Sequence, residues 1–301
     1  MAASSLARQL GALQPEKRTR RGQASLLFDD REAEKYDVQT IFEIGLAGFS
    51  ELCRADAQFR QWESSLFSTS AAEFDRDLQT AEVNATLDAS LSSFFKALCP
   101  HYLQRGAHKA MEFLIRRFRV HVYNVDDIMA CILPHHETLI FARTVAILQF
   151  SDTGLWGFLR GVKKTGAPLN RSMLVQQLRK DEALLTFMAD SALHCGAESE
   201  SVGHPTVKAF LVCCSELLQG GTVPPSAAHQ RILLSTLSRG LAAEAPASMH
   251  AACTGVAVSL ATAVPLSQDI VIGLATAITA VPGTTQEAVA TTVAGLAALY
   301  A

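Results

Sequence analysis

The stretch that decides the fold class is DVQTIFEIGLAGFSELC, residues 37–53. Its apolar side chains recur every three or four residues, at Val38, Ile41, Phe42, Phe49, Leu52 and Cys53. This spacing places them on one face of an α-helix. The alternation of apolar and polar residues that is typical of a half-buried strand is absent over any comparable length. The sequence therefore predicts an all-α protein.

Prolines divide the later part of the chain into segments of helical length. They stand at positions 134, 168, 205, 224, 225, 246, 265 and 282. Because a proline rarely continues a helix, the first, longer intervals fit a helical hairpin and the later, shorter ones fit single helices. A helix pair cannot bury its apolar face alone, so we expect a HEAT/armadillo-like α-solenoid of stacked helical hairpins. The period is loose, and an irregular helical bundle is the alternative.

Composition excludes several classes of protein. The chain has 301 residues, 49% of them hydrophobic and 7% aromatic, which is typical of a globular protein with a large core. A net charge of −3 excludes a uniformly basic nucleic-acid coat, so any contact with RNA must be local. The seven cysteines are scattered without a CxxC pair, and we expect them to be buried free thiols in a reducing compartment.

The last fifth of the chain is nearly uncharged. From residue 240 it carries no Lys or Arg, and its acidic residues are Glu244, Asp269 and Glu287. Pro265, Asp269 and Pro282 interrupt the apolar runs before they reach the ~20 residues of a membrane span. We therefore expect Ala-rich helices buried among their neighbours and no membrane contact. The end of the sequence lacks the polar closing helix of a solenoid, so we also expect the array to continue in a longer native chain.

The N-terminal residues 1–32 differ from the pattern that follows. They contain a basic cluster, Lys17, Arg18, Arg20 and Arg21, next to an acidic stretch. We interpret residues 1–32 as a flexible basic tail and residues 33–301 as the solenoid. The cluster is a candidate nuclear import signal or phosphate contact, and the alternative is a solvated tail without a receptor.

Metal-ligating motifs are incomplete. His136 and Glu137 begin the helix motif of zinc proteases, but Ile140 stands where the second histidine is required. Cys131, His135 and His136 could approach one ion, yet one thiolate and two adjacent imidazoles do not make a tetrahedral set. We expect no metal.

Motifs for nucleotide binding and nucleophilic catalysis are also incomplete. The segment GVKKTG, residues 161–166, lacks the glycine before Lys164 that a phosphate-binding loop requires, and we expect a polar turn between helices. Cys213 and Cys214 lie in an apolar segment with only Lys208 nearby to activate a thiol. We therefore expect a non-enzymatic protein without cofactors. An enzyme with dispersed residues would need a convergent polar pocket that no spacing here indicates.

The segment RGAHKAMEFLIRRFRVHVYN, residues 105–124, predicts a helix with two distinct faces. One face is apolar and predicted to be buried: Met111, Leu114, Ile115 and Phe118. The opposite face carries, at steps of three and four residues, Arg105, Lys109, Glu112, Arg116 and Arg119. We call Arg105, Lys109, Arg116 and Arg119 the basic stripe, and expect it to face outward and to bind RNA phosphates or an acidic protein surface. A solvated face with one Glu112–Arg116 ion pair is the alternative.

The arginine-rich part of this segment also carries a family resemblance. Residues 114–124, LIRRFRVHVYN, are followed by LPHHET at 133–138 and Phe141, and preceded by SLLF at 25–28, GFSEL at 48–52 and FRQWESSLF at 59–67. In order and approximate spacing, this set resembles the N-terminal region of the giant HEAT-repeat protein of the small-subunit processome, the HEAT repeat-containing protein 1 family. The resemblance covers about residues 25–148. His135 and Phe113 depart from the family pattern, where another aromatic residue and a tryptophan are expected.

The resemblance implies a function that the residues alone do not. Members look like non-enzymatic scaffolds of the UTP-A (t-UTP) subcomplex, which assembles on the 5′ external transcribed spacer of pre-ribosomal RNA. The implied partners are the protein subunits of that subcomplex and, within it, pre-ribosomal RNA; the implied location is the nucleus and nucleolus. The alternative is a cytoplasmic adaptor or transport-receptor-like solenoid that binds peptides and has no RNA role.

Replacing Lys17, Arg18, Arg20 and Arg21 with alanine tests the import hypothesis. We expect reduced nuclear entry of the 301-residue chain and an unchanged melting temperature, because a solvated tail contributes no packing. Fluorescence microscopy of the tagged chain measures the first quantity and thermal unfolding the second. Unchanged localisation would favour the solvated tail.

Overall fold

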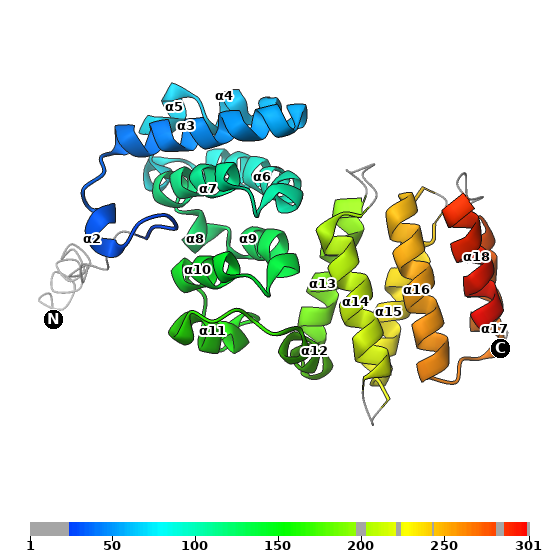
Figure 1. Cartoon of the computed structure of the whole chain (residues 1–301). Coiled ribbons are helices and arrows are strands. Elements are labelled where there is room, and N and C mark those ends of the chain that lie inside the picture. Colours follow the sequence, from blue (N-terminus) through cyan, green and yellow to red (C-terminus); the bar gives the residue numbers. More distant parts are fainter. Residues whose placement is uncertain (1–23, 197–202, 221–223, 243, 281–285, 300–301) are drawn as a thin grey trace, which may run out of the picture.

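The structure is all-α, as the sequence predicts (Figure 1). The computed structural model describes residues 24–196, 203–220, 224–242, 244–280 and 286–299, and these contain no strand. In the first half the α-helices are α2 (Asp30–Ala33), α3 (Val38–Ala55), α4 (Glu63–Leu66), α5 (Thr69–Glu73), α6 (Ala81–Leu98), α7 (Arg105–Phe118), α8 (Val120–Tyr123), α9 (Val125–Ile132), α10 (Leu139–Ile147), α11 (Arg160–Thr165) and α12 (Arg171–Lys180). In the second half they are α13 (Glu182–Gly196), α14 (Pro205–Gln219), α15 (Ala227–Gly240), α16 (Ala247–Ala263), α17 (Gln268–Ala280) and α18 (Gln286–Leu299). Short 3₁₀ turns are η1 (Ala57–Trp62), η2 (Arg76–Leu78), η3 (Cys99–His101), η4 (Leu133–His135) and η5 (Gly157–Leu159).

The second half is a regular solenoid of three helical hairpins. Helices α14, α16 and α18 pack side by side in one row, and α13, α15 and α17 form the other. The first helices of the hairpins begin at Glu182, Ala227 and Gln268, which are 45 and 41 residues apart. This spacing matches the roughly 40-residue period of HEAT-like repeats. The predicted stack of hairpins is therefore confirmed, and the prolines at 205 and 246 stand at or just before the starts of helices in one row.

The first half is less regular. Its long helices alternate with helices of four to six residues and with 3₁₀ turns. Helix α3 packs mainly on α7 and less extensively on η1 and α5, which follow it in the chain, and α6 packs on α9. In Figure 1 the layers from α3 to α12 follow one another downward, whereas α13 to α18 follow one another to the right. Helix α12 contacts both α13 and α14, so the stacking direction changes there.

Local sequence explains most helix ends, with one difference from expectation. The side chains of Asp37, Thr80 and Thr138 accept hydrogen bonds from backbone N–H groups of the first turns of α3, α6 and α10. Asn124 precedes α9, but its side chain makes no capping bond. The segment 161–166 is not the expected polar turn, since residues 161–165 belong to α11. Gly166 adopts a left-handed conformation (φ 67°) and closes that helix.

The boundary of the N-terminal tail is also different from expectation. Within the predicted tail 1–32, residues from 24 onward belong to the folded unit: Leu26 is buried in the core and α2 begins at Asp30. The import candidates Lys17, Arg18, Arg20 and Arg21 lie outside the described residues.

The described residues include no candidate membrane-spanning helix and no disulfide bond. None of them combines the length and the hydropathy that crossing a bilayer requires. All seven cysteines are described; six are buried, Cys53 is partly exposed, and no disulfide joins them.

Helices α3 and α7 approach more closely than ordinary side chains allow. A Cβ atom on Gly48 would lie 2.5 Å from the carbonyl oxygen of Gly106 and 2.5 Å from Cβ of Lys109. A Cβ atom on Gly45 would lie 2.4 Å from Cβ of Phe113. These contacts are with backbone and Cβ atoms, which cannot move without displacing a helix. The close packing of α7 against α3 therefore depends on glycine at 45 and 48.

Gly48→Ala tests this dependence. We expect the free energy of unfolding to fall by about 1–2 kcal/mol, because the overlap with α7 outweighs the ~1 kcal/mol gain in helix propensity. Gly273→Ala is the matched control, since a Cβ atom there meets nothing within 4 Å in the exposed part of α17. It should leave stability unchanged or raise it by up to ~1 kcal/mol. Urea unfolding of both variants measures the difference, and equal effects would contradict the close approach.

Candidate protein or nucleic-acid interface

The structure does not place the basic stripe together on the surface. Arg105 is exposed and has no ion-pair partner among the described residues. Lys109 pairs with Glu51 of α3 at 2.6 Å, and Arg119 pairs with Asp77 at 2.6 Å. The side chain of Arg116 is only 4% exposed. The expectation of joint outward exposure is therefore wrong, while the binding role of these residues remains a prediction.

Both faces of α7 are covered, which is the physical reason for this difference. The predicted apolar face is buried as expected, with Leu114, Ile115 and Phe118 almost without exposed surface. The opposite face packs against α3 through the glycine contacts and against residues 24–33. A helical wheel shows which residues share a face, but not how many faces a neighbour covers.

Glu112 forms the buried anchor of that second face. Its carboxylate accepts hydrogen bonds from the backbone N–H groups of Leu26 (2.7 Å) and Leu27 (3.1 Å) and from the hydroxyl of Ser25 (2.8 Å). Nη1 of Arg116 lies 3.6 Å from Oε1 of Glu112, a distance at which the two attract without a hydrogen bond. The carboxylate thus holds the segment before α2 against α7, rather than compensating a solvated arginine.

Arg116 connects the end of α2 to α7. Its Nη2 donates a hydrogen bond to the carbonyl oxygen of Ala33 at the end of α2. Burial lowers the pKa of the Arg116 guanidinium from its ordinary value, and the charge of Glu112 opposes this effect. Since an arginine pKa lies far above neutrality, the group remains a cation at physiological pH. It is therefore a buried positive charge between α2 and α7.

Arg119 departs from the stripe because α7 ends before it. Its backbone is left-handed (φ 51°, ψ 38°), and it is the only non-glycine residue with positive φ among those described. The regular 100° step per residue stops at Phe118, so the position of Arg119 cannot be extrapolated from the helix. Its side chain turns toward Asp77, and both partners are about half exposed.

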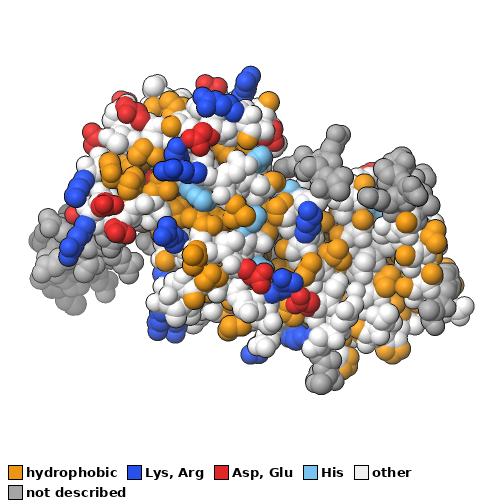
Figure 2. All heavy atoms as spheres, in the orientation of Figure 1, with side chains coloured by type: hydrophobic (Ala, Val, Ile, Leu, Met, Phe, Trp, Pro, Cys, Tyr) orange, Lys and Arg blue, Asp and Glu red, His pale blue; other side chains and the backbone are white. Residues whose placement is uncertain are grey.

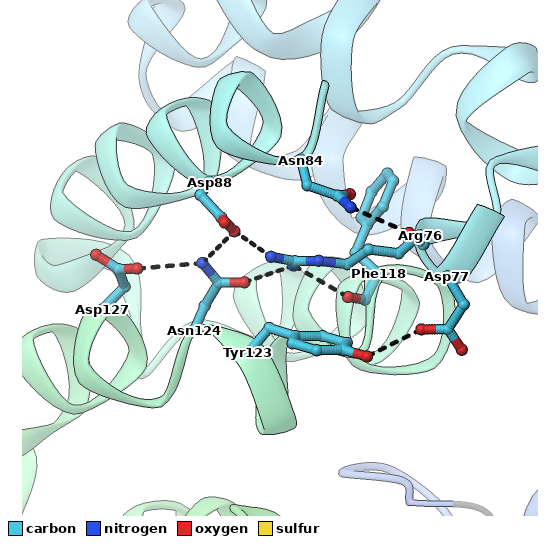
Figure 3. A network of polar contacts seen from close by, with 8 residues as sticks. All are labelled: Arg76, Asp77, Asn84, Asp88, Phe118, Tyr123, Asn124 and Asp127. Atoms are coloured by element: carbon cyan, nitrogen blue, oxygen red, sulfur yellow. Dashed lines mark hydrogen bonds and ion pairs between the residues drawn. The ribbon is translucent and has the colours of Figure 1, made fainter. Parts of the chain in front are cut away.

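A second buried cation, Arg76, was missed by the sequence analysis (Figure 3). Its Nη1 donates to the side-chain oxygen of Asn124 (2.8 Å) and to the carbonyl oxygen of Phe118 (3.3 Å), and its Nη2 pairs with Asp88. The guanidinium also lies 4.4 Å from the centre of the Tyr123 ring. No periodic pattern marks Arg76, because it lies in the short turn η2, far in sequence from α7 and α8.

The neighbours of Arg76 extend this network. Asn124 donates from Nδ2 to Asp88 (2.8 Å) and to Asp127 (3.2 Å), and its Oδ1, the atom that would cap α9, accepts from Arg76. The hydroxyl of Tyr123 donates to Asp77 at 2.9 Å, and this bond raises the pKa of Tyr123. Figure 3 shows the guanidinium of Arg76 between Asp88, Asn124 and the Tyr123 ring. The network joins η2, α6, α8 and α9 and is structural.

Arg117 is the second residue that the sequence analysis missed. It lies between the stripe and the apolar face, it is half-buried, and it has no ion pair or hydrogen bond among the described residues. It lines a pocket of about 230 Å³ where the start of α3 meets the last turn of α7. We call this cavity the α3–α7 pocket. Its lining residues are Tyr36, Asp37, Val38, Ile41, Phe113, Arg116 and Arg117.

The candidate metal ligands make separate local contacts. His135 Nε2 lies 2.9 Å from the carbonyl oxygen of Cys99, and His136 Nδ1 lies 3.1 Å from that of Leu133. Burial lowers the pKa of both imidazoles and raises that of the Cys131 thiol, so all three side chains are neutral near pH 7. No group of three or more His, Cys, Asp or Glu side chains in the described part of the chain is arranged to hold a metal ion.

Comparison with known proteins bears on the predicted family. The chain is 42% identical over 166 residues to human HEAT repeat-containing protein 1, which covers 55% of the chain and 8% of that protein. It is 36% identical over 201 residues to the zebrafish (Danio rerio) HEAT repeat-containing protein 1, covering 66% and 9%. It is 28% identical over 282 residues to U3 small nucleolar RNA-associated protein 10 of Meyerozyma guilliermondii, covering 90% and 15%. No family model matches the chain.

The chain is homologous to HEAT repeat-containing protein 1. The resemblance inferred from the arginine-rich segment is therefore confirmed. The chain spans about 8% of the length of the first relatives that it matches, so their whole-protein functions are not transferred by similarity alone.

Arg76→Met tests whether the Arg76 network is structural. We expect the free energy of unfolding to fall by about 2–4 kcal/mol, because Asp88, Asn124 and a backbone carbonyl lose a charged donor. The matched control is Arg119→Ala, which removes an exposed ion pair and should cost less than about 1 kcal/mol. Chemical denaturation measures both values. Similar, small effects would show that Arg76 is dispensable for stability.

Proposed function

We propose that the chain is the N-terminal part of a non-enzymatic scaffold that acts in ribosome biogenesis, within the small-subunit processome. The observation that carries this proposal is the similarity to U3 small nucleolar RNA-associated protein 10, which extends over 90% of the chain. A relative named for association with the U3 RNA favours a role in pre-ribosomal RNA processing over a cytoplasmic peptide adaptor. The nucleolus is then the site of action.

The architecture supports a scaffold. A solenoid offers a long surface on which several partners can bind, and it needs no catalytic centre. Among the side chains considered above for metal binding or catalysis, Cys131, His136, Cys213 and Cys214 are buried, and both His135 and His136 contact backbone carbonyl oxygens. We propose protein subunits of the UTP-A/t-UTP subcomplex as the direct partners, with the 5′ external transcribed spacer of pre-ribosomal RNA contacted within the complex.

The charge distribution favours protein contacts over extensive RNA contacts. Of the basic stripe, only Arg105 is exposed without a partner among the described residues, while Lys109 and Arg119 are paired with acidic side chains. Figure 2 shows Lys and Arg intermixed with Asp and Glu over the first half, and few charged side chains over the visible face of the second half. On this face of the described residues, a polyanion such as RNA therefore meets isolated cations rather than a continuous basic track.

Expression of the tagged 301-residue chain in human cells tests the proposal, since the human relative is 42% identical. We expect nucleolar accumulation and co-purification of U3 RNA and pre-ribosomal RNA above the level recovered with an unrelated helical solenoid of similar size. The measurements are microscopy and quantitative reverse transcription of the purified RNA. A diffuse cytoplasmic chain without U3 RNA would contradict the proposal and favour the peptide adaptor.

Charge reversal separates RNA contact from protein contact in the same assay. Arg105→Glu with Arg119→Glu should leave the fold intact, because both side chains are at least partly exposed. If these residues bind phosphates, the slope of log affinity against log salt should fall by roughly 0.7–0.9 for each phosphate that is no longer bound. Failure of a protein to co-purify, with unchanged affinity for RNA, would instead assign these arginines to a protein interface.

A further inference from the structure

The α3–α7 pocket combines a cation with an apolar surface. Its cavity of about 230 Å³ lies between the start of α3 and the last turn of α7. The side chains of Ile41 and Phe113 are buried beneath it. Tyr36 and Val38 remain 37% and 55% exposed, and both are among the large apolar side chains that reach the surface. A cavity of this size accepts one or two side chains of a partner.

The two arginines of the pocket have unused hydrogen-bond donors. Nε of Arg117 and Nη1 of Arg116 are buried, and neither has a hydrogen-bond partner among the described residues, although Nη1 lies 3.6 Å from the Glu112 carboxylate. The side chain of Arg116 is almost completely buried, since only 4% of its surface is exposed. Buried donors are normally satisfied, so the unpartnered guanidinium of Arg117, a residue that lines the cavity, indicates a ligand that supplies acceptor oxygens. Carboxylates suit the forked geometry of guanidinium groups.

The pocket is held in shape before any ligand binds. The ring of Tyr36 packs against Phe28, with ring centroids 4.3 Å apart. Asp37 accepts a hydrogen bond from the backbone N–H of Thr40 at 2.8 Å and so fixes the first turn of α3. The Phe113 ring contacts Phe42 edge-on at 5.5 Å. A preorganised site loses less conformational entropy on binding.

The same surroundings disfavour a nucleic acid. The carboxylate of Asp37 lies in the pocket lining, and hydrogen bonding to Thr40 lowers its pKa, so it is ionised at neutral pH. It repels every phosphate of a nucleic-acid chain that comes near, so a polyanion is disfavoured more than a single carboxylate. The cavity also lacks room for a stack of bases, and only one aromatic ring, Tyr36, is both exposed and part of the lining.

We propose that the α3–α7 pocket docks a short segment of a partner protein in which an aspartate or glutamate stands next to a large apolar side chain. Arg117 binds the carboxylate, with the charge of Arg116 nearby, and Tyr36, Val38 and Ile41 contact the apolar side chain. The inference rests on the proposed function only for the source of the partner, a subunit of the same complex. The recognition chemistry follows from the pocket itself.

Selection from a displayed library of random peptides, each about 12 residues long, on the full 301-residue chain tests the proposal. We expect the recovered peptides to share an acidic residue within two positions of Phe, Trp, Leu or Ile. A synthetic peptide of the recovered sequence should bind the chain, and replacing its Asp or Glu by the corresponding amide should weaken binding at least tenfold. Fluorescence anisotropy measures the affinities.

Variants of the chain locate the binding site. Arg117→Glu and Val38→Asp should each weaken the peptide at least tenfold, with unchanged melting temperatures. Val38 is 55% exposed, so its variant remains informative even where Arg117→Glu is unstable. Arg143→Glu is the matched control, because Arg143 is an exposed arginine of α10 outside the pocket, and it should change nothing.

Several outcomes would overturn the inference. The first is that the selected peptides share no pattern of an acidic residue next to an apolar one. The second is that the peptide binds wild type and Val38→Asp equally well. The third is that a short single-stranded RNA displaces the peptide at comparable concentration. Failure of the proposed function is seen separately, because it is measured by nucleolar location and U3 RNA recovery. If the chain binds the acidic peptide but recovers no U3 RNA, this inference stands and the scaffold proposal is rejected.

Discussion

The N-terminal half is built around the close approach of α3 to α7. Glycine at positions 45 and 48 lets the backbones meet where any Cβ atom would overlap Phe113, Gly106 or Lys109. Because α3 lies over the polar side of α7, that side is largely removed from solvent. A helix with an amphipathic sequence is thus buried on two faces, and those of its charged side chains that are buried must find partners within the protein. The α3–α7 pocket lies at the end of the same contact, where the two helices begin to separate.

Two buried charges of the first half, Glu112 in α7 and Arg76 in η2, find their partners in different ways. Glu112 is fully buried and accepts three hydrogen bonds from residues 25–27, so it joins the N-terminal segment to α7. Arg76 is surrounded by Asp88, Asn124 and a backbone carbonyl, and so joins η2 to the layers below it. Burial of a charge is costly unless it is paired and hydrogen-bonded, and both sites meet this condition. Hydrogen bonds of these two side chains require particular directions, so they determine how neighbouring segments are placed. This suits the irregular first half, where no repeat geometry determines the packing.

The two halves of the chain build their cores from different side chains. The first half has a cluster of rings in which Phe49 stacks on Phe67 at 4.2 Å and Phe94 contacts Phe59, Trp62 and Phe67. From α14 onward the described core has one large ring, Phe210, and is otherwise made of Leu, Val, Ala, Cys and similar side chains. Large rings fill the irregular spaces between helices of unequal length. Small side chains instead allow the regular, close stacking of α14, α16 and α18, which extends a surface with few charges.

The helical class, the hairpin repeat of the second half and the family resemblance could all be predicted from the amino-acid sequence. They follow from periodicity, proline positions and a long motif, which are local properties of the chain. The buried face of α7 was predicted correctly for the same reason, because apolar residues spaced three and four apart have one stable destination. The opposite face of α7 depends on the packing of distant segments, since a helical wheel cannot show that α3 and residues 24–33 cover it. The left-handed Arg119, the buried Arg76 and the unpaired Arg117 likewise result from contacts between segments far apart in the chain, and such contacts leave no periodic trace in the sequence.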